Sequence, residues 1–220
     1  MHSLFTFTHT IRDLRQLMPP YRPVDYQAKS ILERQAAKLL EIFDIREAPV
    51  DVALIAELPR LEVVVRPSRE VVDDHGRQLS GLTKWDKGRW LIKINRDDSP
   101  TRRRFTLAHE FGHVLEHPFV RVLYADTYGR LDEQRMEDHC DYFAACLLMP
   151  RPWVKQAWAN LTQDQARLAA YFRVSPAAMA RRLAYLNLTE PHPARHLPQP
   201  IRRYFRHAPA SVPLSTELVA

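Results

Sequence analysis

Residues 109–113 read His109-Glu110-Phe111-Gly112-His113, a His-Glu-x-x-His motif inside a run from Phe105 to Glu116 that is typical of a helix. Side chains four positions apart lie on one face of a helix, so the two imidazoles are neighbours. Imidazoles with this spacing bind zinc, and the adjacent glutamate accepts a proton from water. A catalytic zinc ion takes three protein ligands and one open position. The fold must therefore bring a third ligand to this helix.

His117 is the nearest further histidine, but the helical geometry excludes it as the third ligand. Eight residues of helix rise about 12 Å, whereas zinc–nitrogen bonds are about 2 Å long. Pro118 then ends the helix. The metzincin class needs a glycine and a histidine where this chain has Glu116 and Phe119, so that class is excluded as well.

A second predicted helix, residues 133–148, offers a better third ligand. Glu137 and Asp141 are four residues apart and share a face, which is the layout of gluzincins. In that arrangement Glu137 binds zinc, and Asp141 holds a histidine ligand in the required tautomer. The alternative is a solvated acidic face, because Glu133 and Asp138 lie in the same stretch.

Several motifs in order make the chain similar to a known family. They are Arg103 to His117, Glu137 to Pro150, the upstream segments Pro49 to Ala56 and Ser80-Gly81, and the downstream segment Leu168 to Leu183. Over roughly residues 27–188 the chain resembles the ImmA/IrrE family of bacterial metallopeptidases. It departs from the family pattern at His139, where a second glutamate is common, and at Cys140 and Asp141, where Ala and Asn or Asp are usual.

The resemblance implies a cytoplasmic zinc endopeptidase. Many relatives cleave a repressor of the Xre helix-turn-helix type and so switch genes on, which links the family to stress responses. We expect one zinc ion per chain, held by His109, His113 and Glu137, with Asp141 as an outer hydrogen-bond partner. Glu110 is the expected catalytic base. A further hydrogen-bond donor usually stabilises the oxyanion. The sequence leaves His139, Tyr142 and Tyr171 open as candidates for this donor.

The expected fold class is α+β. Three strands, at residues 61–65, 79–85 and 89–95, precede the two zinc-site helices in a zincin-like core. Shorter helices follow and form a C-terminal bundle that resembles a helix-turn-helix. The segment 79–83 is the expected edge strand, where a substrate peptide can add as a further strand. An ordinary hairpin strand is the alternative reading of this segment.

The predicted domain organisation has three parts. Residues 1–26 form an N-terminal extension read as a surface arm, residues 27–188 form the peptidase domain including C-terminal helices at 152–188, and residues 189–220 form a proline-rich basic tail. The net charge of +6 permits acidic partners. The first ten residues lack the basic and long apolar stretches of a signal peptide, so we expect none, and we expect no membrane-spanning segment. Two cysteines do not make a disulfide framework.

Two functions of other classes compete with the peptidase. One is a zinc-bound sensor without catalysis. The other is a DNA-binding regulator, because residues 163–186 resemble a helix-turn-helix in which Arg181 and Arg182 meet phosphates. However, the second helix begins Pro176-Ala177-Ala178-Met179, which offers little to read base edges. We therefore expect no specific DNA binding and no membrane partner.

Overall fold

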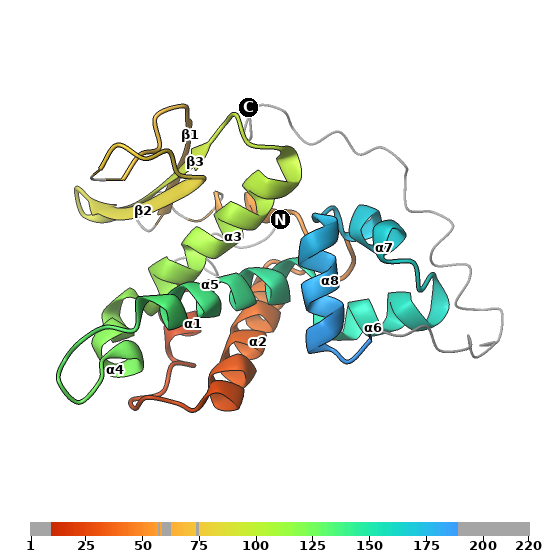
Figure 1. Ribbon diagram of the computed structural model, residues 1–220, viewed down its shortest axis with the longest axis horizontal. Coiled ribbons are helices and arrows are strands. Elements are labelled where there is room, and N and C mark those ends of the chain that lie inside the picture. The colour runs from red at the N-terminus through yellow and green to blue at the C-terminus, as the bar shows by residue number, and fades with distance from the viewer. Residues whose placement is uncertain (1–9, 57, 59–62, 74, 189–220) are drawn as a thin grey trace.

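The computed structural model describes residues 10–56, 58, 63–73 and 75–188 of the 220-residue chain. The predicted tail at 189–220 lies outside the described residues. Helices and a small sheet make up the described part (Figure 1). In chain order the elements are α1 (Thr10–Arg15), α2 (Asp25–Ile42), the 3-10 turn η2 (Val52–Ile55), β1 (Val63–Ser68), β2 (Gly81–Asp86), β3 (Arg89–Asn95), α3 (Pro100–Glu116), the 3-10 turn η3 (His117–Phe119), α4 (Val120–Tyr124), α5 (Glu133–Leu148), α6 (Arg151–Asn160), α7 (Gln165–Phe172) and α8 (Pro176–Tyr185).

The sheet has three strands in the order β1-β3-β2. β1 runs parallel to β3, and β2 runs antiparallel to β3 with Gly81 opposite Ile94. Lys87 and Gly88 have φ angles of 49° and 79°, and they form the tight turn that joins β2 to β3. The predicted α+β class and three-stranded sheet are confirmed. Among the described strands β2 pairs only with β3, so its other side is an edge.

Local sequence signals account for the bounds of α3 and α5. Ser99 caps α3, because its side chain accepts a hydrogen bond from the backbone N–H of Arg102 at 3.3 Å, and Pro100 follows at the first helical position. Asp132 caps α5 in the same way through Arg135 N–H at 3.1 Å. Both helices therefore begin directly after a side chain that accepts a hydrogen bond from a free backbone N–H of the first turn.

The crossing of α3 and α5 is unusually close at Gly112. A Cβ atom on this glycine would lie 3.2 Å from Cys140 Sγ and 3.4 Å from Cys140 Cα. Small residues on both helices thus allow the two backbones to approach. This approach brings the ligand faces of α3 and α5 together (Figure 1).

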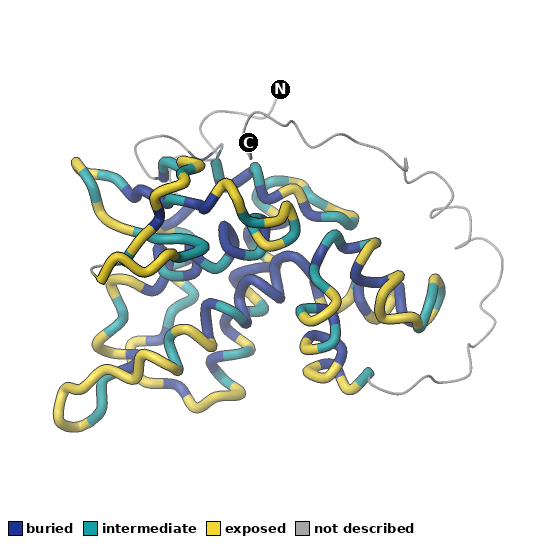
Figure 2. The backbone as a smooth tube through the Cα atoms, turned by 45° about the horizontal axis from the view of Figure 1, so that its top comes forward, coloured by how far each residue is buried: buried dark blue, intermediate teal, exposed yellow. Residues whose placement is uncertain are grey.

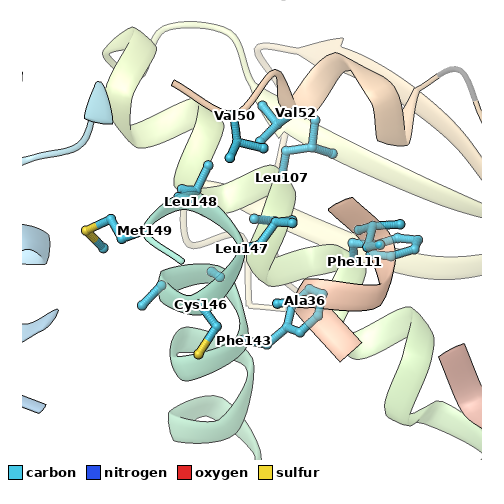
Figure 3. Close-up of a cluster of buried hydrophobic side chains, with 14 of the residues drawn as sticks. Ala36, Val50, Val52, Leu107, Phe111, Phe143, Cys146, Leu147, Leu148 and Met149 are labelled. Carbon is cyan, nitrogen blue, oxygen red and sulfur yellow. The ribbon is translucent and has the colours of Figure 1, made fainter. Parts of the chain in front are cut away.

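The hydrophobic core lies where α2, α3 and α5 meet. Phe111 and Phe143 are fully buried, with ring centroids 6.3 Å apart. Figure 3 shows them beside Leu107 and Leu147, with residues of α2 and of the segment around η2 packed on the same cluster. The buried stretch follows the α5 backbone through the middle of the molecule (Figure 2). Packing on both sides fixes α3 and α5 as the rigid frame of the site.

The N-terminal extension differs from the predicted surface arm. Residues 10–15 form α1, in which Ile11 and Leu14 are buried. Gln35 Nε2 donates to Leu14 O at 3.1 Å, and Arg15 Nη2 donates to Val114 O at 2.6 Å. The helix is too short to show a period in the sequence. Its contacts attach it to α2 and to the end of α3.

Two further segments form short helical elements. Residues 119–131 contain the helix α4, and Ala125 forms an isolated bridge with Leu131. The segment after Pro49 contains the 3-10 turn η2, which Asp51 caps through Ala53 N–H at 2.9 Å. Both are segments of one turn, for which tertiary contacts outweigh local propensity.

The C-terminal helices α6, α7 and α8 lie beyond the C-terminal end of α5, and α7 packs on α8 (Figure 1). The Arg182 side chain is fully buried, forms an ion pair with Glu33 on α2 at 3.0 Å and donates to Met149 O at 2.9 Å. It is therefore unable to contact a phosphate, which corrects the role given to it in the DNA-binding alternative. Among the described residues, none of the helices is long and apolar enough to cross a membrane.

Candidate metal centre

His109, His113 and Glu137 converge at the crossing of α3 and α5, and their ligand atoms all lie within 4.8 Å of one another. The two Nε2 atoms are 3.1 Å apart. Glu137 carboxylate oxygens lie 3.2 Å from His109 Nε2 and 3.4 Å from His113 Nε2. The acidic face of α5 is thus directed at the histidine pair through Glu137.

These separations fit a tetrahedral metal ion. Bonds of about 2.0 Å in tetrahedral geometry place two ligand atoms about 3.3 Å apart. The Nε2–Nε2 distance and the distances from each Nε2 to its nearer Glu137 oxygen, Oε2 for His109 and Oε1 for His113, are close to this value. His117 takes no part, because its ring packs edge-on against Trp90 with centroids 4.8 Å apart. Two imidazoles and one carboxylate are a ligand set of catalytic zinc sites, which keep the fourth position open.

Asp141 supports His109 from the side opposite the metal position. Its Oδ1 lies 2.9 Å from His109 Nδ1, and its Oδ2 accepts from Arg181 on α8 at 3.1 Å. Burial raises the pKa of Asp141, but the hydrogen bond with His109 and the charge of Arg181 outweigh burial and lower it. An ionised Asp141 keeps the proton of His109 on Nδ1, which leaves Nε2 free to bind a metal.

The pKa values of the two histidines are shifted in opposite directions. Burial lowers the pKa of His109, but hydrogen bonds to Asp141 and Glu137 outweigh burial and raise the pKa to about 9. Burial and the neighbouring charge of His109 lower the pKa of His113 to about 4. At neutral pH the pair therefore carries one positive charge, on His109, while His113 is a neutral imidazole.

Metal binding is expected to release about one proton per chain at pH 7, because His109 must lose its proton to bind. The raised pKa of His109 means that the proton competes with the metal below about pH 9, so apparent affinity should rise roughly tenfold per pH unit from pH 6 to 8. Calorimetry in buffers of different ionisation enthalpy measures the released protons. Binding without proton release and without pH dependence would contradict this expectation.

Glu110 lies beside the metal position and is buried. Thr83 on β2 donates its hydroxyl proton either to Glu110 Oε2 at 2.8 Å or to the Glu110 backbone oxygen at 3.1 Å. Burial raises the pKa of Glu110, while the Thr83 hydrogen bond and His109 oppose that shift. A raised pKa suits a carboxylate that takes a proton and later returns it. The contact with Thr83 was not predicted, although strand alternation from Ser80-Gly81 places Thr83 on the same face as Gly81.

Gly81 allows β2 to pass close to the catalytic side of α3. A Cβ atom at this position would lie 2.5 Å from Thr106 Cγ2 and 2.6 Å from Glu110 Oε1. We expect Gly81→Ala to lower the free energy of unfolding by about 1–3 kcal/mol, the usual cost of overpacking. Thermal unfolding measures the effect. Ser80→Ala is the control, because it removes only the bond from Arg102 and should change stability by less than about 0.5 kcal/mol.

The three sequence-based candidates for the oxyanion donor lie in different surroundings. His139 is buried and its Nδ1 lies 2.9 Å from the Tyr124 hydroxyl, so it does not line the cleft. Tyr142 does line the cleft, but its hydroxyl donates to Glu33 at 3.1 Å. Tyr171 also lies outside the lining of the cleft.

The site opens into a cleft of about 770 Å³. The approach to β2 forms one wall, α3 and α5 form the floor, and α8 forms the opposite wall. Lining residues that matter for the chemistry are Leu79, Ser80, Gly81, His109, Glu110, Asp141, Ala178 and Arg181. Residues 79–81 of the predicted edge segment 79–83 thus line the cleft, and α8 contributes to it.

Comparison with solved structures shows a similar fold. A Mycobacterium tuberculosis transcriptional regulator matches 80% of this chain and 51% of its own length, with a TM-score of 0.53 and 15% sequence identity. At that identity the likeness concerns the fold alone.

Comparison with curated proteins shows partial sequence matches. The radiation response metalloprotease IrrE of Deinococcus radiodurans is 36% identical over 69 residues, and that of Deinococcus deserti is 39% identical over 69 residues. The alignments cover 30% of this chain and 21% and 25% of those proteins. An uncharacterized immunity region protein 2 of Bacillus phage phi105 is 29% identical over 83 residues, 38% of this chain and 52% of the phage protein.

The family match is broader than these pairwise alignments. The peptidase M78 family, described as the IrrE N-terminal-like domain, matches residues 63–184, from the start of β1 to the last turn of α8. That range contains the ligands, Glu110, Thr83 and the cleft walls. The resemblance found in the sequence is thereby confirmed: the chain belongs to the peptidase M78 family of IrrE N-terminal-like metallopeptidase domains.

Proposed function

We propose that this protein is a zinc-dependent endopeptidase that cuts a partner protein. The observation that carries the proposal is the convergence of His109, His113 and Glu137 at tetrahedral spacing, with the buried Glu110 beside them. His109, His113 and Glu137 hold the metal, and Asp141 orients His109. When bound, a zinc ion supplies a Lewis acid that polarises a carbonyl and acidifies water.

Glu110 moves the protons of the reaction. When Thr83 holds Oε2, Oε1 is the oxygen available to take a proton from the attacking water. The same carboxyl group then delivers that proton to the nitrogen of the leaving amine. Burial favours this exchange, because the raised pKa of Glu110 brings it nearer to neutral pH. Thr83 keeps the carboxyl group in place between the two steps.

A substrate peptide binds in the cleft as an added strand on β2. Leu79 N–H and Ser80 O are already hydrogen-bonded to Val71 O and Asn95 N–H, so the proposed pairing uses the backbone groups from Gly81 onward that face away from β3. Pairing with them would orient the scissile bond over the metal. α8 faces this strand from the other side through Ala178 and Arg181. An extended segment of a partner protein fits this geometry better than a folded surface.

The proposed partner is an Xre-type helix-turn-helix repressor in the cytoplasm, whose cleavage relieves repression. Support comes from the family resemblance and from the similarity to an immunity region protein of a phage. We also propose that the chain does not bind DNA specifically. Arg182 is buried and Arg181 is paired with Asp141, so neither is free to read a duplex.

Incubation of the purified chain with an Xre repressor encoded beside it tests the proposal. We expect two repressor fragments in the presence of zinc, none after chelation, and recovery when zinc is restored. Mass spectrometry of the fragments gives the bond that is cut. An intact repressor under all these conditions, with zinc bound to the chain, would contradict the peptidase and favour the zinc-bound sensor.

A further inference from the structure

The side of His113 that faces away from the metal position meets a buried pair of residues. Its Nδ1 lies 3.3 Å from Cys140 Sγ, and that sulfur lies 3.5 Å from Glu116 Oε2. Cys140 is fully buried, and Glu116 is 2% exposed. The peptidase chemistry described above makes no use of either residue.

The two histidine ligands differ in how they are supported. His109 contacts a carboxylate directly through Asp141 at 2.9 Å. For His113 a cysteine sulfur stands between the ring and the carboxylate of Glu116. Histidine ligands of metals generally donate their other ring N–H to a carboxylate, carbonyl or water, and this bond fixes the ring. For His113, the Cys140 sulfur is the group that lies where such a hydrogen-bond acceptor is expected.

We propose that Cys140 and Glu116 form a hydrogen-bond relay that positions His113 for metal binding, as Asp141 positions His109. The inference rests on the proposed metal site. Because His113 offers Nε2 to the metal, its proton lies on Nδ1 and is donated to Cys140 Sγ. The thiol proton is in turn donated to Glu116 Oε2. Cys140 and Glu116 are positioning residues in this scheme.

The surroundings of Glu116 complete the relay. His139 Nδ1 lies 2.9 Å from the Tyr124 hydroxyl. Burial raises the pKa of Glu116 to about 7, and the nearby Tyr124 hydroxyl opposes that shift by favouring the carboxylate. The Cys140 thiol and the Tyr124 hydroxyl thus both favour the carboxylate of a buried group that would otherwise be costly.

Packing holds the sulfur in its place. The position that a Cβ atom of Gly112 would occupy is 3.2 Å from Cys140 Sγ, so the helix crossing closes over the thiol. A second reading treats Cys140 as a small apolar filler. Cys146 provides the comparison, because it is a buried free cysteine on the same helix and contacts Arg182 at 3.4 Å instead of a metal ligand.

Zinc affinity of the full chain, measured by competition with a chelator, tests the relay. We expect Cys140→Ala and Glu116→Leu each to weaken zinc binding about 10- to 100-fold. The double variant should be no weaker than the worse single variant by more than about threefold, because both changes break one relay. Glu116→Gln keeps an acceptor oxygen and should recover at least half of the loss on a logarithmic scale.

Cys146→Ala is the matched control and should bind zinc within about twofold of the wild type. The absorption spectrum of the cobalt-loaded chain should change in Cys140→Ala and stay constant in Cys146→Ala. Wild-type zinc affinity in Cys140→Ala, or losses that multiply in the double variant, would overturn the relay. A wild-type chain that binds no zinc would instead overturn the proposed function, so the two failures are distinguishable.

Discussion

Replacing Glu110 with glutamine is expected to lower cleavage of the partner protein by about 100- to 10,000-fold. The amide cannot take the proton of the attacking water, and it has nearly the same shape as the carboxylate that Thr83 holds at 2.8 Å. Glu110 is not among the three converging ligands, so zinc content should stay at about one per chain. Fragment yield over time and metal analysis on the same preparation measure both effects.

Glu133→Gln is the matched control for this substitution. Glu133 lies in the first turn of α5, is exposed and is outside the metal cluster. Its amide variant should cleave at the wild-type rate. If Glu110→Gln and wild type cut equally fast, the assignment of the catalytic base is wrong.

The second large effect is expected for Glu137→Ala, which removes one of the three proposed ligands. Zinc affinity should fall by more than the roughly 10–100-fold that loss of an outer hydrogen-bond partner costs. The remaining histidines lie 3.1 Å apart and lose the carboxylate that neutralises the ion. Measurement of the zinc dissociation constant for folded wild type and variant checks this.

Asp138→Ala controls for the loss of a carboxylate on the same helix. Asp138 is the next residue, and its Oδ1 accepts a hydrogen bond from Gln134 instead of contacting the histidines. It should keep zinc affinity within about threefold of the wild type, since an exposed charge acts weakly over distance. Loss of zinc in Asp138→Ala together with full retention in Glu137→Ala would refute the ligand assignment.

The parts of the fold that could be predicted from the sequence depend on local signals. The predicted range 133–148 coincides with α5, because Asp132 caps one end and Met149-Pro150 follows the other. The β2–β3 hairpin is predicted for a similar reason, since Lys87-Gly88 allows a tight turn. The short helices α1 and α4 lack such signals, and tertiary contacts stabilise them.

In the candidate site, too, local features could be predicted from the sequence and long-range contacts could not. The pairing of His109 and His113 follows from spacing along one helix. The contacts of Thr83 with Glu110 and of Arg181 with Asp141 join residues 27 and 40 positions apart, so only the folded chain brings them together. The proposed role of Cys140 is the part of the site that the sequence alone predicts least. Its role depends on the distance between two crossing helices, which Gly112 makes small.

We propose one metal ion bound by His109, His113 and Glu137. In this site the Cys140 sulfur contacts His113 Nδ1 and does not bind the metal. X-ray absorption at the zinc edge of the zinc-loaded full chain tests this most directly. We predict four nitrogen and oxygen neighbours at about 2.0–2.2 Å, two of them imidazoles, and no sulfur neighbour. A sulfur neighbour at about 2.3 Å, or a site without imidazole, would contradict the account.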